Sequence, residues 1–120
     1  IHQIDVPQFE EAPWIHKYNG KYYLTYASGW PEKIAYAIAD NIGGPYRPMG
    51  VISEIAGNSN TTHPAIVQFR GKWIFFSHNG GLRDGTSYSR SVIAEPMSYD
   101  AAGRILPIPP TSEGACGLFR

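Results

Sequence analysis

The sequence repeats itself at a spacing of 51 residues, and this repeat constrains the fold more than any other feature. Residues 10–29, EEAPWIHKYNGKYYLTYASG, align without a gap with residues 61–80, TTHPAIVQFRGKWIFFSHNG. The identical positions are Pro13/Pro64, Ile15/Ile66, Gly20/Gly71, Lys21/Lys72 and Gly29/Gly80. An ungapped match of this length predicts one structural unit built twice.

Short apolar runs bounded by Gly, Pro and Asn predict strands along the whole chain. No segment keeps a 3.6-residue apolar period over the length of a typical helix. The expected strands are Trp14 to Lys17, Lys21 to Ala27, Lys33 to Ala39, Ala65 to Phe69, Lys72 to Ser77 and Ser91 to Glu95. We therefore expect an all-β protein.

The turn inside each copy indicates how these strands pair. Asn19-Gly20 separates the first two runs, and Arg70-Gly71 takes the same place in the second copy. Asn-Gly between apolar runs favours a tight hairpin, because both central residues of a type I′ turn need positive φ. Each copy then reads as three strands and a shorter fourth, which is typical of a β-propeller blade. We expect two four-stranded antiparallel blades, residues 9–55 and 61–110, followed by a tail over 111–120.

One alternative fold is a small β-sandwich in which two unrelated hairpins resemble each other by chance. In a propeller, the first strand of each blade runs beside the central channel, so equivalent positions surround one axis. Glu11 aligns with Thr62, and Ala12 aligns with His63. The polar residues that differ between the copies are therefore expected at the mouth of the channel, where ligands bind.

Composition excludes several classes of partner. Ten basic residues balance ten acidic ones, so no net field attracts nucleic acid or an anionic membrane. No apolar run approaches the ~20 residues of a membrane-spanning helix. The single cysteine, Cys116, cannot form an internal disulfide, so packing alone should hold the fold. Because the chain starts at Ile1 without an initiator methionine, we expect that upstream residues were removed or belong to another part of a longer polypeptide.

From about Phe9 to Ile108 the chain resembles the C-terminal half of glycoside hydrolase family 43. The resemblance rests on FEEAPWIHKYNGKYYLTYASG, PEKIAYAIADNIGGPYRPMGVI, GNSNTTHPAIVQFRGKWIFFSHNG and RSVIAEPMSYDAAGRILPI. The family includes β-xylosidases, α-L-arabinofuranosidases and arabinanases. The resemblance implies a five-bladed propeller, hydrolysis with inversion, and plant polysaccharide such as arabinoxylan or arabinan as substrate. Inversion requires acid and base carboxyls roughly 6.5–9.5 Å apart, so that a water fits between base and sugar.

The resemblance assigns three residues to the site. Glu11, in Glu-Ala-Pro, takes the position of the family's general acid, which protonates the leaving oxygen. His63, before Pro64, matches a channel histidine near a calcium ion or water cluster on the propeller axis. Arg90 matches an arginine that reaches the sugar pocket from the last blade.

Other candidate residues follow from their place in the repeat. Glu10 should face away from Glu11, because successive side chains of a strand point to opposite faces. Trp30 follows Gly29 in a loop and is a candidate wall for a sugar ring, whereas Trp14 lies in a strand and is expected in the core. His78 ends a strand and either lines the pocket or caps the turn.

The family's general base and the aspartate that raises the acid's pKa lie upstream of the glutamate, and no aspartate here matches them. We expect the missing groups to come from the remaining blades or from further copies of this chain. The alternative is a half-propeller that self-assembles and binds carbohydrate, or hydrolyses another bond such as an acetyl ester, without glycosidase activity. A polymeric plant substrate also implies a secreted or periplasmic protein.

Overall fold

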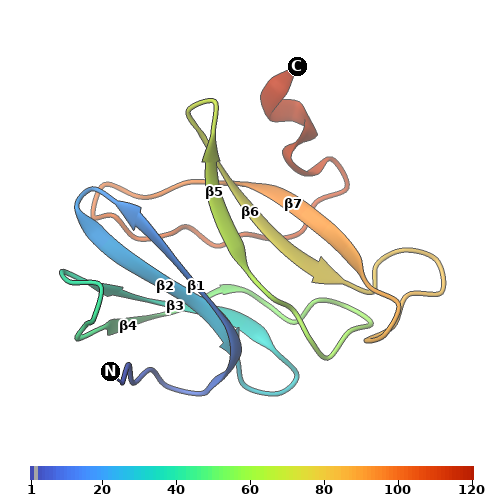
Figure 1. Cartoon of the computed structure of the whole chain (residues 1–120). Coiled ribbons are helices and arrows are strands. Elements are labelled where there is room, and N and C mark those ends of the chain that lie inside the picture. Colours follow the sequence, from blue (N-terminus) through green and yellow to red (C-terminus); the bar gives the residue numbers. More distant parts are fainter. Residues whose placement is uncertain (2) are drawn as a thin grey trace.

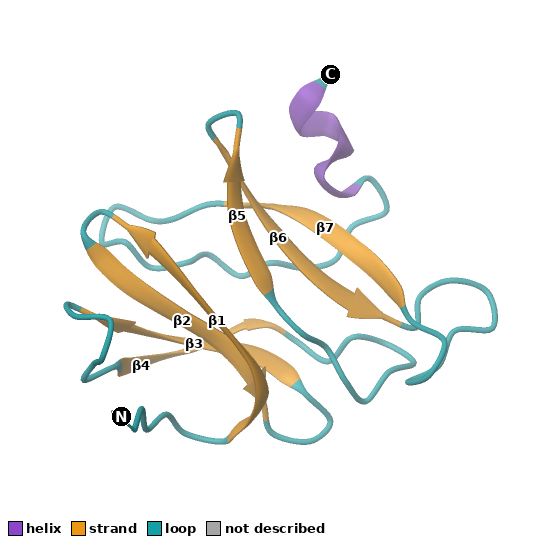
Figure 2. Cartoon of the chain, viewed as in Figure 1, coloured by secondary structure: helices purple, strands orange, loops and turns teal. Residues whose placement is uncertain are grey.

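The computed structural model describes residue 1 and residues 3–120, and strands dominate it (Figures 1 and 2). The strands are β1 (Phe9–Tyr18), β2 (Lys21–Ser28), β3 (Lys33–Ala39), β4 (Arg47–Ser53), β5 (Ala65–Phe69), β6 (Lys72–Asn79) and β7 (Ser91–Met97). A short 3₁₀ helix, η1 (Gly114–Phe119), lies near the C-terminus. The all-β prediction is confirmed.

The strands form two antiparallel sheets, one for each copy of the repeat. The first sheet has the order β1-β2-β3-β4, as a four-stranded blade requires. The second has the order β5-β6-β7, so the fourth strand expected there is not found among the described residues. The sheets lie side by side in Figure 1, where β1 and β5 face each other.

The chain after β7 leaves the second sheet and returns to the first. The Ile108 N–H donates to the Ile52 carbonyl at 2.7 Å, which ties the returning segment to β4. Pro107, Pro109 and Pro110 interrupt this segment. Because proline has no N–H to donate, such a segment cannot extend a regular ladder along β7. The second blade therefore ends with three strands, and its last segment joins the two sheets.

Both hairpin turns have the predicted backbone. Asn19 and Gly20 have φ of 46° and 75°, and Arg70 and Gly71 have 48° and 74°. Positive φ at both central positions is what a type I′ turn requires. The repeat thus predicts the turn geometry even at Arg70, whose residue type alone would not suggest it.

The main core lies between the sheets and the returning segment. It contains Tyr23, Ile34, Tyr36, Ile38, Ile52, Ile66, Phe75, Met97, Ile105 and Ile108. A second cluster, on the other face of the first sheet, contains Leu24, Tyr26, Ala35, Ala37, Ala39 and Tyr46. Strands β2 and β3 contribute to both clusters, because alternate residues point to opposite faces. This double burial explains why both strands read as continuous apolar runs.

Strand β1 begins at Phe9, earlier than the expected Trp14. Its register with β2 shifts between Phe9 and Glu11 and again between Glu11 and Trp14. Ala12 has φ 55°, which is the local kink of an irregular strand. Such bulges change the direction of side chains and are common beside functional sites.

Trp14 is 37% exposed, so the prediction that it lies in the core is wrong. Its indole N–H instead donates to the Ile66 carbonyl at 3.0 Å and joins β1 to β5.

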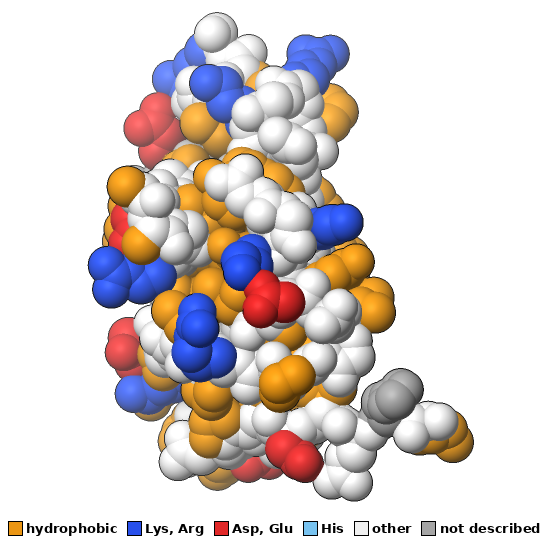
Figure 3. All heavy atoms as spheres, turned by 90° about the vertical axis from the view of Figure 1, so that its left-hand side faces the viewer, with side chains coloured by type: hydrophobic (Ala, Val, Ile, Leu, Met, Phe, Trp, Pro, Cys, Tyr) orange, Lys and Arg blue, Asp and Glu red, His pale blue; other side chains and the backbone are white. Residues whose placement is uncertain are grey.

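The surface carries no large area of one charge on the face shown in Figure 3, where basic and acidic groups are scattered among apolar ones. No helix within residues 3–120 has the length and hydropathy needed to cross a membrane.

Candidate functional site

The candidate residues gather at one end of the two sheets. Glu11 pairs with Ala27 near the end of β2, and Ser28 pairs with Lys33 where β3 begins. In the second sheet, Asn79 at the end of β6 pairs with Ser91 at the start of β7. The turn before β3, the linker before β5 and the loop before β7 therefore meet at this end.

Glu11, His63 and Glu32 form the centre of the site. The His63 Nε2–H donates to Glu11 Oε1 at 2.9 Å, and the same Nε2 lies 3.8 Å from Glu32 Oε2. The side chains of Glu11 and His63 are 52% and 37% exposed, whereas that of Glu32 is 1% exposed. Glu11 and His63 can therefore reach a bound molecule. Glu32 lies buried next to them and is not accessible to such a molecule.

Glu32 was not among the residues predicted from the sequence. Its carboxylate Oε2 accepts the Thr62 N–H at 2.8 Å, and its own N–H donates to the Asn60 carbonyl at 2.9 Å. These two bonds fix the linker that carries His63. In the sequence, Glu32 is an ordinary acidic residue in a turn, and no pattern distinguishes it from a solvated one.

The two carboxyls have opposite pKa shifts. The hydrogen bond from His63 lowers the pKa of Glu11, and hydrogen bonding with Glu32 and the positive charge of Arg90 act in the same direction. Burial raises the pKa of Glu32, and the neighbouring Glu11 adds to this. The pKa of the exposed carboxyl is thus lowered, and the pKa of the buried carboxyl is raised.

His78 and Arg90 lie beside this centre. The His78 ring packs against His63 with centroids 4.7 Å apart at 71°, and burial lowers its pKa to about 4. Both nitrogens of His78 are buried and have no hydrogen-bond partner among the described residues. Arg90 Nη1 donates to Thr61 Oγ1 at 3.2 Å. Thr61 lies two positions before His63, so Arg90 reaches the same linker.

Trp30 and Arg90 line one cavity of about 300 Å³ together with Asn60, Thr61, Ser87 and Tyr88. The structure thus brings the five predicted residues to the same end of the sheets. Glu11, His63 and His78 are in successive contact, and Trp30 and Arg90 border the adjoining cavity. Tyr88 was not predicted, although a tyrosine in a glycine-rich loop is a signal for an exposed aromatic ring.

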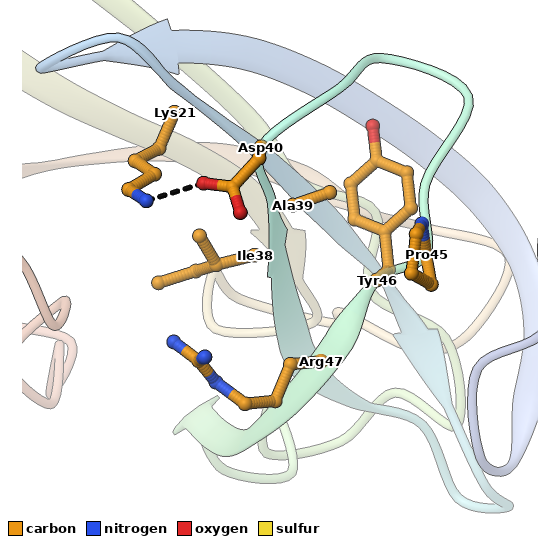
Figure 4. Close-up of a pocket in the computed structure, with 7 residues that line it drawn as sticks. All are labelled: Lys21, Ile38, Ala39, Asp40, Pro45, Tyr46 and Arg47. Atoms are coloured by element: carbon orange, nitrogen blue, oxygen red, sulfur yellow. Dashed lines mark hydrogen bonds and ion pairs between the residues drawn. The ribbon is translucent and has the colours of Figure 1, made fainter.

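Another cavity, of about 270 Å³, lies at the opposite end of the first sheet (Figure 4). Lys21 and Asp40 form an ion pair there, and Arg47 lies on the same side of the sheet. Lys21 pairs with Tyr18 at the far end of β1 from Glu11. This cavity is therefore separate from the candidate site.

The donor set at the centre fits a divalent cation. Glu11, Glu32 and His63 offer three ligand atoms that all lie within 4.8 Å of one another. Carboxylate oxygens are the ligands that Ca²⁺ prefers, and imidazole is a common metal ligand. A cation held by His63 Nε2 would replace the hydrogen bond from His63 to Glu11.

Comparison with known proteins identifies the family. The model of glycosyl hydrolases family 43 matches residues 3–105, nearly the whole chain. The chain belongs to glycoside hydrolase family 43. Its relatives include a xylosidase/arabinosidase from Bacteroides ovatus, 45% identical over 102 residues, which are 84% of this chain and 31% of that protein. A β-xylosidase from Xylanibacter ruminicola is 43% identical over 102 residues, again 84% and 31%.

Solved structures of family 43 members share the fold. An enzyme from Xanthomonas citri superposes with a TM-score of 0.81 at 36% identity, over 85% of this chain and 30% of that one. A β-xylosidase/α-arabinofuranosidase from a compost metagenome, solved with xylotriose in a calcium-free form, gives 0.80 at 41% identity, over 85% and 31%. The two sheets are thus blades of a partial propeller, and the family resemblance read from the sequence is confirmed. The chain spans about 31% of the length of these two curated relatives.

Proposed function

We propose that this chain supplies the general-acid half of an inverting glycosidase that cleaves arabinofuranosyl or xylosyl linkages in plant polysaccharide. Glu11 is the proposed acid, and the observation that carries the proposal is its position. It is an exposed carboxyl on the irregular strand β1, in contact with His63 and close to a cavity bordered by Trp30 and Arg90. Family membership supports a glycosidase, and the activity of the complete protein is part of the proposal.

Proton donation by Glu11 requires help from outside this chain. A general acid works best when its pKa is near the operating pH, and here His63 lowers the pKa of Glu11. A carboxylate placed near Glu11 by the remaining blades would raise that pKa, because like charges disfavour ionisation. We propose that those blades also supply the general base. Glu11 would then donate its proton to the leaving oxygen, while Arg90 and His78 orient the sugar.

Glu11, Glu32 and His63 are the residues that would hold a calcium ion. A bound calcium ion would supply positive charge beside the reacting sugar. Calorimetric titration with Ca²⁺ should give binding to the native chain and none to His63→Ala; equal binding by both would remove His63 from the metal site.

A polymeric substrate supports a secreted or periplasmic location for the whole protein.

The general-acid role is tested by grafting residues 3–105 into the Bacteroides ovatus relative in place of its matching segment. With the native graft, we expect hydrolysis of both an alkyl xyloside and a 2,4-dinitrophenyl xyloside. Glu11→Gln should lower kcat on the alkyl xyloside by about 10²–10⁴-fold, because an alkoxide needs a proton to leave. It should lower kcat far less on the dinitrophenyl xyloside, whose leaving group needs none.

Glu10→Gln is the matched control, because it removes the neighbouring carboxyl and leaves Glu11 unchanged. This variant should hydrolyse both substrates at the native rate. Equal losses on the two substrates in Glu11→Gln would show that Glu11 does not act as the proton donor.

A further inference from the structure

Two exposed aromatic rings border the cavity beside the candidate site. Trp30 follows β2 and is 65% exposed, and Tyr88 precedes β7 and is 98% exposed. An aromatic side chain with nearly its whole surface in water contributes little to the core. Both rings line the same hollow of about 300 Å³, although they come from different blades.

The polar groups of this cavity are partly free to bind a ligand. The Asn60 N–H donates to Ser87 Oγ at 2.9 Å, which ties the linker before β5 to the loop before β7. The side-chain amide of Asn60 and the hydroxyl of Tyr88 have no hydrogen-bond partner within residues 3–120. Arg90 makes a single hydrogen bond, to Thr61, and no ion pair within that range. Aromatic faces with a few unpaired donors suit a sugar, which has an apolar face and a rim of hydroxyls.

The cavity adjoins the proposed catalytic residue. Asn60 lies in the linker that Glu32 anchors, and the same linker carries His63 against Glu11. Arg90 lies between the two regions: it lines the cavity, and its charge lowers the pKa of Glu11. A sugar at Glu11 would therefore have its neighbour in the polymer within reach of the aromatic rings.

We propose that Tyr88 and Trp30 form a binding subsite for the sugar unit next to the reacting one, and that Tyr88 makes the protein prefer oligosaccharides to single sugars. This inference rests on the proposed function for the identity of the reacting sugar. The ring of Tyr88 stacks on the neighbouring sugar, and Arg90 and Asn60 bind its hydroxyls. We expect a single sugar bound beside Glu11 not to reach Tyr88, because Glu11 does not line the cavity that Tyr88 borders.

The test is an NMR titration of the isotope-labelled 120-residue chain with xylotriose and, separately, with xylose. Xylotriose should shift the Trp30 indole N–H signal to saturation at a concentration at least tenfold below that of any response to xylose. In Tyr88→Ala, the affinity for xylotriose should fall about tenfold, while the response to xylose should not change. Because Tyr88 is 98% exposed, this variant should keep the native spectrum elsewhere.

Leu82→Ala is the matched control, since Leu82 is 71% exposed in the same loop and does not line the cavity. It should bind xylotriose as the native chain does. Native affinity in Tyr88→Ala, or a Trp30 signal that xylotriose leaves unmoved, would overturn the inference.

The grafted enzyme separates this inference from the proposed role of Glu11. There Tyr88→Ala should raise KM for xylotriose and leave KM for xylosyl fluoride unchanged, because a fluoride leaving group does not reach the neighbouring subsite. Failure of the Glu11 experiment together with a Tyr88-dependent xylotriose affinity would reject the acid role and keep the subsite. Loss of activity in Glu11→Gln with no effect of Tyr88→Ala would do the reverse.

Discussion

At the scale of single residues, the two carboxyls of the site have different roles. Glu11 is exposed and its hydrogen bond with His63 lowers its pKa, whereas Glu32 is buried and its carboxyl accepts the backbone N–H of Thr62. Only the exposed carboxyl can touch a substrate. The buried one is a positioning residue, because it fixes the linker on which His63 stands.

Glu32 should therefore contribute more to stability than an exposed glutamate. Glu32→Ala leaves the buried Thr62 N–H without its acceptor, which costs about 1–3 kcal/mol in the free energy of unfolding. The control is Glu54→Ala, which removes a 73% exposed side chain that pairs with Lys33 at 2.8 Å. A surface ion pair is worth about 0–1 kcal/mol. Urea denaturation followed by circular dichroism measures both, and equal effects would mean that Glu32 does not hold the linker.

At the scale of elements, a partly buried histidine joins the two sheets. His16 on β1 stacks on Tyr23 of β2 with ring centroids 5.1 Å apart, and it packs against Trp73 of β6 at 5.4 Å. Its Nε2 forms a 2.7 Å hydrogen bond with the Tyr99 hydroxyl, in the segment that returns from β7. Four segments thus meet at one imidazole. Burial lowers its pKa to about 4.

Because the pKa of His16 is lowered, the free energy of unfolding should decrease in acid. Free histidine has a pKa of about 6.5, so the unfolded chain takes up a proton before the native chain does. Stability is then constant above about pH 6.5 and falls as the pH drops toward 4, by at most about 1.4 kcal/mol per pH unit for each such histidine. The pKa of His78 is also about 4, so unfolding in this pH range takes up a second proton at His78. His16→Phe should lower the slope of unfolding free energy against pH by up to one proton, measured by urea denaturation from pH 7 to 4.5. An unchanged slope would show that His16 does not cause the loss of stability in acid.

The elements also show what could be read from the sequence and what could not. The hairpins at Asn19 and Arg70 were predictable because turn residues and strand runs are local signals. The missing fourth strand of the second blade depends on where the chain after β7 finds partners, and that is decided by tertiary contacts with Ile52. The grouping of Glu11 with His63 followed from the repeat, which places residues 11–12 and 62–63 around one axis. Glu32 escaped prediction because its burial depends on packing against another blade.

At the scale of the molecule, the first sheet leaves apolar surface exposed at the start of β1. The outer face at the start of β1 has a hollow of about 340 Å³ lined by Ile4, Val6, Phe9, Pro13, Ile15 and Leu24. Phe9 is 46% exposed and Ile15 is 39% exposed. Apolar surface of this kind marks a contact face or an aggregation hazard, and an open strand edge adds to it. This hollow is the expected contact for the remaining blades or for another copy of the chain.

The 120-residue chain should therefore associate in solution, and the hollow should be where it does so. Multi-angle light scattering should give a mass that rises with concentration above the 13.3 kDa of one chain. Ile15→Glu places a charge in the hollow and should shift the mass toward the monomer, because an unpaired charge is costly to bury in a contact. Val92→Glu is the control, since Val92 is 76% exposed on β7 and lies outside the hollow. Circular dichroism should show both variants folded. A native chain that stays monomeric at all concentrations would rule out association through copies of itself, and the hollow would then have to be covered by a different segment of propeller.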